Sequence, residues 1–156
     1  MATRGMRNNN PFNIVRSSSR WLGLSKFKTD PKFCEFEDLN YGLRAGLMLI
    51  ANYVRYRHLV SVKSIIERFA PPSENDTERY ICFVASHIAD YIGQSSVVVL
   101  HDLRVEVGEK VYFLLCQAIC LYESTYCPSL GKLSQIYLDY GIGANTQTAS
   151  SLASEI

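Results

Sequence analysis

The sequence predicts a mainly α protein, and three observations lead to that class. Apolar residues recur at helical spacing in several separate segments, each bounded by a capping residue or by Gly and Pro. The longest apolar segment, residues 109–124, is apolar nearly all round, as in a helix that runs through the middle of a domain. Residues 1–32 instead mix turn formers with isolated apolar anchors. We therefore expect helices preceded by an irregular N-terminal third.

Length and composition suit one globular domain. The chain has 156 residues, of which 47% are hydrophobic and 12% aromatic, and its formal net charge is +1. A chain of this length buries a substantial core, and a charge so near zero gives no general attraction to nucleic acid or membrane surfaces. We expect a single helical domain over residues 1–143 and a flexible tail over residues 144–156, where small polar residues dominate.

The N-terminal third contains an unusual asparagine run, in "RGMRNNNPFNI" at residues 4–14. Asparagine is a poor helix and strand former because its amide competes for nearby backbone groups. Such a run fills a loop tip or lines a polar groove, since amides both donate and accept hydrogen bonds. Further on, "KFCEFEDL" alternates and allows a short extended hairpin, with Glu35 and Glu37 expected to face solvent.

The first predicted helix starts at Asp38 or Asn40 and runs to about residue 56. Gly42 and Gly46 leave a smooth patch on it, where another backbone can approach closely. The next predicted helix is capped by Ser61 and stopped by the two prolines at 71 and 72.

Three further helices complete the prediction. One follows the prolines, is capped by Ser73 or Asn75 and ends at Gly93. The apolar segment 109–124 forms the second, and "LSQIYLDYGI" from residue 133 forms a shorter third one. Between the first two, "SSVVVL" fits a buried strand and a linker equally well.

Cysteine usage predicts no metal or disulfide framework. The five cysteines, at positions 34, 82, 116, 120 and 127, lack the paired spacing of a zinc site. We expect reduced, mostly buried thiols and neither a metal nor another cofactor. No signal peptide is visible, and the longest apolar stretch is too short for a membrane span, so the expected site of synthesis is a cytoplasm.

Carboxylates are the candidate catalytic groups. Glycoside cleavage needs a carboxylic acid that keeps its proton near neutral pH, and a second carboxylate acts as base or nucleophile. Glu123 ends the most apolar helix, where the helix dipole and apolar neighbours favour the protonated form. Glu74 and Asp76 lie near a predicted helix start, which favours the ionised form and a base or electrostatic role. The alternative for Glu123 is a glutamate that points to water, and the alternative for Glu74 and Asp76 is a role in capping the helix.

Four stretches resemble a family of small phage and prophage virion structural proteins, some of them regarded as lysozyme-like. They are "RGMRNNNPFNI", "FCEFEDLNYGLRAGLMLIANY", "IIERFAPPSENDTERYI" and "QAICLYES". A fainter similarity links the chain to flagellar-type peptidoglycan glycosidases, in which a helix ends in a catalytic glutamate and an "NNxFxI" stretch follows. Here the pieces stand in the opposite order, as in a circular permutation of a compact helical domain.

The resemblance implies a lysozyme-like helical domain that cleaves peptidoglycan glycan strands with Glu123 as general acid, assisted by Glu74 or Asp76. The implied ligand contacts come from Arg7 and the loop amides and from aromatic side chains that stack on sugars; they are Arg7, Asn9, Asn10, Asn13, Trp21 and Tyr53. Other virion proteins are further implied partners, and the virion, the periplasm or the cell wall is the implied site of action. The alternative is a non-catalytic virion structural or interaction protein. The glycosidase interpretation predicts that the asparagine loop and Glu123 lie close together in the fold.

Overall fold

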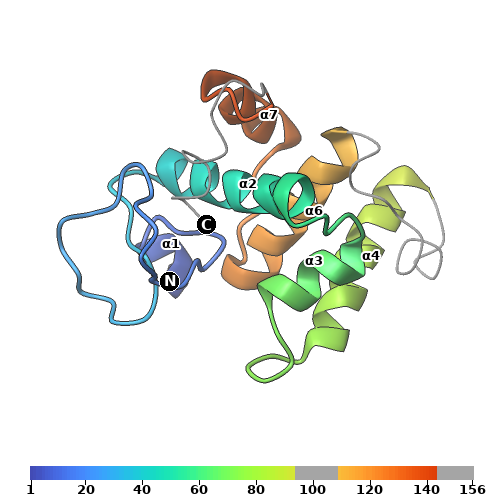
Figure 1. The fold of residues 1–156 in the computed structure, drawn as a ribbon, viewed down its shortest axis with the longest axis horizontal. Coiled ribbons are helices and arrows are strands. Elements are labelled where there is room, and N and C mark those ends of the chain that lie inside the picture. The colour runs from blue at the N-terminus through green and yellow to red at the C-terminus, as the bar shows by residue number, and fades with distance from the viewer. Residues whose placement is uncertain (94–108, 144–156) are drawn as a thin grey trace.

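The computed structural model describes residues 1–93 and 109–143. Over these residues the chain forms helices and no extended strand, which confirms the mainly α prediction (Figure 1). The helices are α1 (Arg4–Arg7), α2 (Leu39–Tyr56), α3 (Val62–Phe69), α4 (Thr77–Ile92), α6 (Glu109–Ser124) and α7 (Leu130–Asp139). The "SSVVVL" segment and the proposed tail lie outside the described residues.

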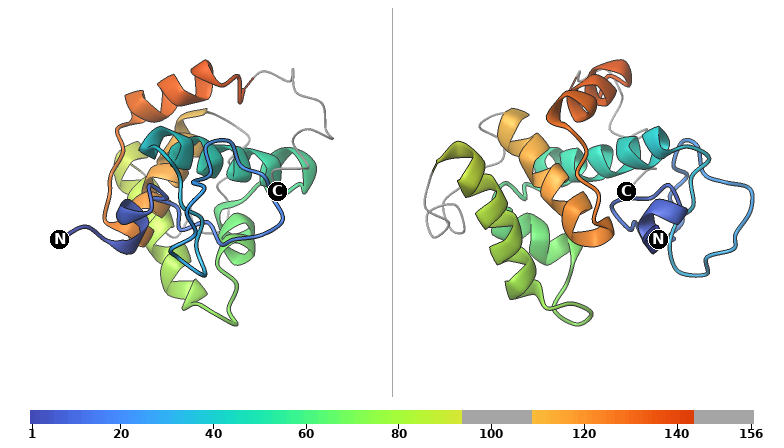
Figure 2. Two further views of the ribbon diagram at one scale, coloured as in Figure 1. Left: turned by 90° about the vertical axis from the view of Figure 1, so that its left-hand side faces the viewer. Right: turned by 180° about the vertical axis from the view of Figure 1, so that it is seen from behind.

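Helix α6 is the central element, as its all-round apolar sequence predicts. It contacts α1, α2, α4 and α7, and its middle turns are buried. Helix α3 packs on α4 and α2, and α7 covers α2 and α6 from the opposite side (Figures 1 and 2). The core is therefore built around a single central helix and does not lie between two layers of helices.

Capping residues set the starts of α2 and α3 where the sequence places them. The Asp38 side chain accepts a hydrogen bond from the backbone N–H of Asn40 at 2.8 Å, and Ser61 forms a capping box with Ser64. Two starts differ from the prediction. Helix α4 begins after Asp76 because residues 71–76 form a turn first, and α7 begins one turn early because Ser129 caps it.

The N-terminal segment, residues 1–38, wraps around one end of α2 and α6 (Figure 1). Apart from the single turn of α1 it is irregular. The expected hairpin is reduced to two isolated antiparallel bridges, which join Val15 to Phe33 and Leu24 to Phe36.

The predicted smooth patch on α2 is where this segment docks. A Cβ atom built on Gly42 would lie 1.8 Å from the backbone oxygen of Asn9, and one on Gly46 would lie 2.0 Å from the ring of Phe12. Phe12 is fully enclosed. The two glycines thus let the loop backbone and a buried ring lie directly on the helix, which confirms the prediction of a close approach.

Buried polar groups hold the rest of the N-terminal segment together. Asp30 accepts two hydrogen bonds from the Arg4 guanidinium, at 2.6 and 2.7 Å, and others from Asn8 and from the backbone N–H groups of Lys32 and Phe33. The Arg4 contact and these N–H groups keep the pKa of Asp30 far below its ordinary value, against the opposing effect of burial.

Glu35 was expected to face solvent, and that expectation is wrong. Its carboxylate is buried and accepts hydrogen bonds from the backbone N–H of Asp30, from the Thr29 hydroxyl at 2.9 Å and from Arg16 at 3.2 Å. Burial alone would raise the pKa of Glu35, but these donors together lower it. Alternation in a short segment predicts a face for each side chain only where a sheet exists, and here there are two bridges instead of a sheet.

The five cysteines are unpaired; those at positions 34, 116 and 120 are buried and those at 82 and 127 are exposed. Within residues 1–93 and 109–143, no helix has both the length and the apolar character needed to cross a bilayer.

Candidate functional site

A surface groove of about 280 Å³ lies where the N-terminal segment, α2, the turn after α3 and the end of α6 meet. Five of the nine side chains proposed from sequence line it: Asn13, Trp21, Tyr53, Glu74 and Glu123. They come from four different parts of the chain, so the fold, and not a local motif, brings them together. Trp21 and Tyr53 are almost wholly enclosed in the wall, at 4% and 7% exposure.

Glu123 and Asn13 are in direct contact inside this groove. The Asn13 side-chain amide donates to Glu123 Oε1 at 2.9 Å and to the Glu123 backbone oxygen at 3.3 Å. The two residues are separated by 110 positions in the sequence. The expected meeting of the asparagine loop with Glu123 is thus present in the structure.

Backbone geometry explains why an asparagine stands at position 13. Asn13 has φ of 52°, in the left-handed region that asparagine tolerates better than most residues. A turn bond from its N–H to the Asn10 oxygen, at 2.9 Å, closes the loop behind it. The amide is consequently aimed at the end of α6, and its own oxygen is enclosed without a hydrogen bond to any described residue.

The end of α6 is fixed by contacts that sequence reasoning did not find. The Ser124 hydroxyl donates to the Pro11 backbone oxygen at 2.9 Å, and the Thr3 hydroxyl donates to the Ser124 oxygen at 2.9 Å. Thr125, with φ of 49°, turns the chain out of the helix. Glu123 therefore stands on a helix end that is bound to the asparagine loop on one side and released into a turn on the other.

Tyr80 from α4 lies behind Glu123, and it too was missed as a site residue. Its ring stacks on Tyr122 with centroids 3.9 Å apart, and its side chain is fully buried. Burial first, and then the nearby Glu123 carboxylate, raise the pKa of Tyr80 well above its ordinary value. The phenol therefore keeps its proton beside the carboxylate. The sequence predicts a tyrosine on the apolar face of a helix to be a core residue, and no local pattern distinguishes Tyr80 from the other residues of that face.

The other four predicted residues lie outside the groove lining. Arg7 is exposed and donates to the Ala2 oxygen at 2.7 Å, and the Asn9 amide donates to the Phe36 oxygen at 3.1 Å. Asp76 caps α4 by accepting from the Arg79 N–H at 3.2 Å. Each of these three side chains has a structural partner where a ligand contact was expected.

Asn10 requires a correction, because a fully enclosed side chain cannot face a ligand. Its amide nitrogen donates to the Ile14 and Cys34 oxygens, at 3.0 and 2.9 Å, and its oxygen accepts from the Ile14 N–H at 3.0 Å. The Asn10 side chain thus joins the backbone at Ile14 to the backbone at Cys34 by hydrogen bonds, as a β-sheet ladder would do in a regular structure.

The groove offers carboxylates, amides and aromatic rings, together with the Lys32 ammonium and the hydroxyls of Ser17 and Ser19. In the two described ranges, no group of three or more His, Cys, Asp or Glu side chains could hold a metal ion. The described residues thus form a helical protein with a polar and aromatic surface groove, and the Glu123 carboxyl group is part of the lining of that groove.

Comparison with known proteins relates the chain to a phage protein. No family model matches it. It is 46% identical over 88 residues to Protein P5 of Pseudoalteromonas phage PM2, an alignment that covers 54% of this chain and 55% of the relative. The chain thus spans about half the length of the curated relative it matches. A phage connection is supported, as the resemblance implied, whereas lysozyme-like character has no support from this relative.

Proposed function

We propose that the chain is a protein of a phage particle. Its similarity to a phage protein supports this role. The test is a search for the protein in purified particles by mass spectrometry, with host proteins as the measure of contamination. The protein is expected to co-purify with particles through a density gradient at a constant ratio to the capsid protein. Its presence in infected-cell lysate but not in banded particles would contradict the proposal.

We further propose that the groove binds a glycan strand of peptidoglycan and cleaves it. The contact between Asn13 and Glu123 is the observation that carries this proposal, because it fixes the direction of a carboxyl group that lines the groove. Trp21 and Tyr53 line the same groove, but at 4% and 7% exposure they present little surface to a sugar, so the polar lining carries this proposal.

In the proposed reaction the protonated Glu123 carboxyl donates its proton to the glycosidic oxygen as the bond from that oxygen to the sugar carbon breaks. A water molecule adds to the sugar carbon and loses a proton to a carboxylate, so that one water is consumed for each bond cleaved. Glu74 is exposed and lines the same groove, and it is the residue we assign to accept this proton. Asp76 lies outside the groove lining and has no role in the proposed step.

The loss of turbidity of purified peptidoglycan tests this proposal. Glu123→Gln keeps the shape of the side chain and removes its acid, and we expect the rate to fall by about 10²- to 10⁴-fold. Glu78→Gln is the matched control, since Glu78 is exposed on α4 and outside the groove lining. Equal activity of wild type and Glu123→Gln would refute the assignment of the acid.

The second candidate function is a non-catalytic virion protein, and the comparison favours it because the relative's name states no activity. This candidate is selected if the wild type is found in particles and has no activity on peptidoglycan of several chemical types.

A further inference from the structure

A second pocket, of about 570 Å³, lies at the corner between α2 and α3. Three cationic side chains line it: Arg57, Lys63 and Arg68, here called the basic corner. All three are exposed, and Glu67 is the one acidic residue in the lining. Three cations and one carboxylate give the pocket lining a net charge of +2, whereas the whole chain carries only +1.

Tyr53 links the basic corner to the groove. Tyr53 lines the groove, and its hydroxyl lies close to Arg68 and, at longer range, to Arg57. Burial raises the pKa of Tyr53, while these two cations oppose the rise. Arg68 also directly precedes Phe69 and Ala70, which line the groove. Arg68 therefore lies beside a side chain of the groove wall, within reach of a group that branches from a ligand in the groove.

The cations of the corner are available to a ligand. Lys63 Nζ lies 3.9 Å from Glu67 Oε1, and both side chains are about half exposed, at 50% and 47%. A pair of this kind contributes little and exchanges partners readily. Within residues 1–93 and 109–143, Arg57 and Arg68 make no ion pair.

We propose that the basic corner binds the carboxylates of the peptide stems carried by the glycan strand, an inference that rests on the proposed glycan site. Stem peptides branch from alternate sugars and bear free carboxylates, so a strand in the groove presents anions to its side. A guanidinium group pairs with a carboxylate through two parallel hydrogen bonds, which suits Arg57 and Arg68 better than a single ammonium would. The preferred substrate is therefore glycan that still carries its stems.

A phosphate polymer is the other anion that could meet these residues. In the groove the charges of Lys32 and Glu74 offset each other and Glu123 is protonated in the proposed reaction, so the groove offers a polyanion no net positive charge, which favours the peptide stem. Three cations beside one glutamate also form a compact spot, not the extended stripe that tracks a phosphate backbone.

The test is fluorescence anisotropy with labelled glycan strands, either with intact peptide stems or after their removal by an amidase. The protein carries Glu123→Gln in every sample, so that binding is measured without cleavage. We expect stem-bearing strands to bind about tenfold more tightly than bare strands, and we expect Arg57→Gln with Arg68→Gln to abolish this difference. Binding to bare strands is expected to stay unchanged in the double variant.

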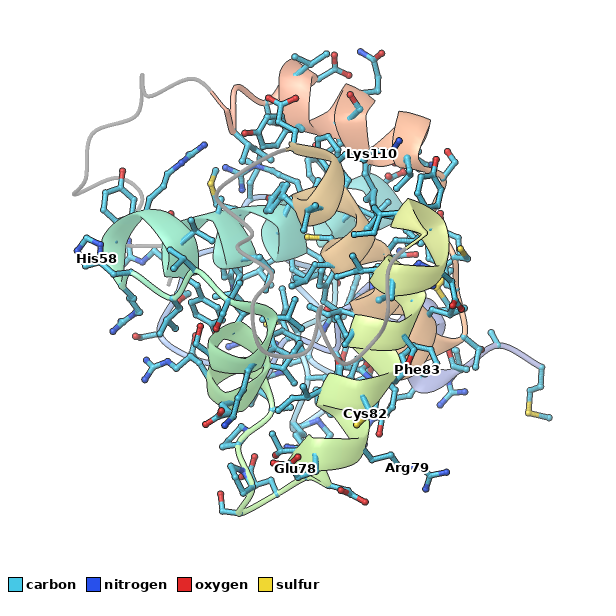
Figure 3. All side chains as sticks on the ribbon, turned by 90° about the vertical axis from the view of Figure 1, so that its right-hand side faces the viewer. His58, Glu78, Arg79, Cys82, Phe83 and Lys110 are labelled. Carbon is cyan, nitrogen blue, oxygen red and sulfur yellow. The ribbon has the colours of Figure 1, made fainter. Side chains whose placement is uncertain are left out.

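Arg79→Gln is the matched control, since Arg79 is exposed on α4 and lies outside both pockets. Figure 3 shows it at the start of α4, away from His58, the residue that follows Arg57 at the end of α2. Equal affinity for stem-bearing and bare strands would overturn the inference, as would an equal effect of Arg79→Gln or tighter binding of a labelled oligonucleotide. Failure of the glycan proposal itself looks different, because then bare strands do not bind at all.

Discussion

The N-terminal segment, residues 1–38, and the helical part of the molecule, α2 to α7, are stabilised by different interactions. The helices bury apolar side chains around α6, such as Leu114, Leu115 and Ile119, which have no exposed surface. The N-terminal segment buries a few rings and otherwise depends on enclosed polar side chains, chiefly Asn10, Asp30 and Glu35.

This difference shows how an irregular segment acquires one conformation. Without a ladder of backbone hydrogen bonds, its N–H and C=O groups must find other partners, and the carboxylates and amides of these side chains supply them. The same segment supplies the Asn13 amide to the groove. A precise contact with Glu123 therefore depends on the less apolar of the two regions.

The largest expected effect comes from separating the two regions at Gly42. A methyl group there would lie 1.8 Å from the Asn9 oxygen, so Gly42→Ala forces the N-terminal segment away from α2. We expect a loss of about 3 kcal/mol in the free energy of unfolding, from overpacking against backbone. Gly131→Ala is the control, because the nearest atom there is 4.0 Å away, and it is expected to stabilise α7 slightly. Chemical denaturation measures both, and equal effects at the two glycines would show that the segment docks differently.

Acid is expected to release the N-terminal segment before the helices. The folded-state pKa of Asp30 is lowered, first by Arg4, so its stabilisation is complete above the unfolded value of about 3.9 and is lost as the pH falls below it. Glu35 is lowered as well and acts in the same direction. Hydrogen exchange between about pH 6 and pH 3 should show the Lys32 and Phe33 amides losing protection while α6 keeps it.

Asp30→Asn is the variant that isolates this effect. It is expected to weaken protection of the N-terminal segment at neutral pH and to reduce its dependence on pH to the part that Glu35 contributes, because the Asp30 carboxylate is gone. Loss of protection in α6 and in the segment at one common pH, in wild type and variant alike, would contradict the division of the molecule into two differently stabilised regions.

The smallest expected effect lies at the junction of the two regions. Thr125 adopts φ of 49° directly after α6, a conformation that is strained for a β-branched residue. Thr125→Gly removes this strain and is expected to stabilise the fold by about 1 kcal/mol, measured by thermal unfolding. A destabilised variant would show that the hydrogen bond from the Thr125 hydroxyl to the Ser124 oxygen, 2.7 Å long, matters more than the backbone strain.

The sequence by itself determined the features that depend on neighbouring residues. The mainly α class, the central apolar helix, the caps at Asp38 and Ser61 and the glycine patch on α2 all follow from periodicity, capping chemistry and the missing Cβ. Each of these features can be predicted because the residues that define it lie within one or two helical turns of one another.

Only the tertiary structure decided which polar residues face the groove. Asn9, Asn10 and Asn13 stand within five positions, yet Asn13 alone of the three lines the groove, because the amides of the other two are bonded to backbone oxygens of the N-terminal segment. The burial of Glu35 and the position of Tyr80 behind Glu123 were likewise invisible in sequence. Amide and carboxylate groups serve backbone and ligand equally well, and the docking of segments more than a hundred residues apart is what assigns each of them to one or the other.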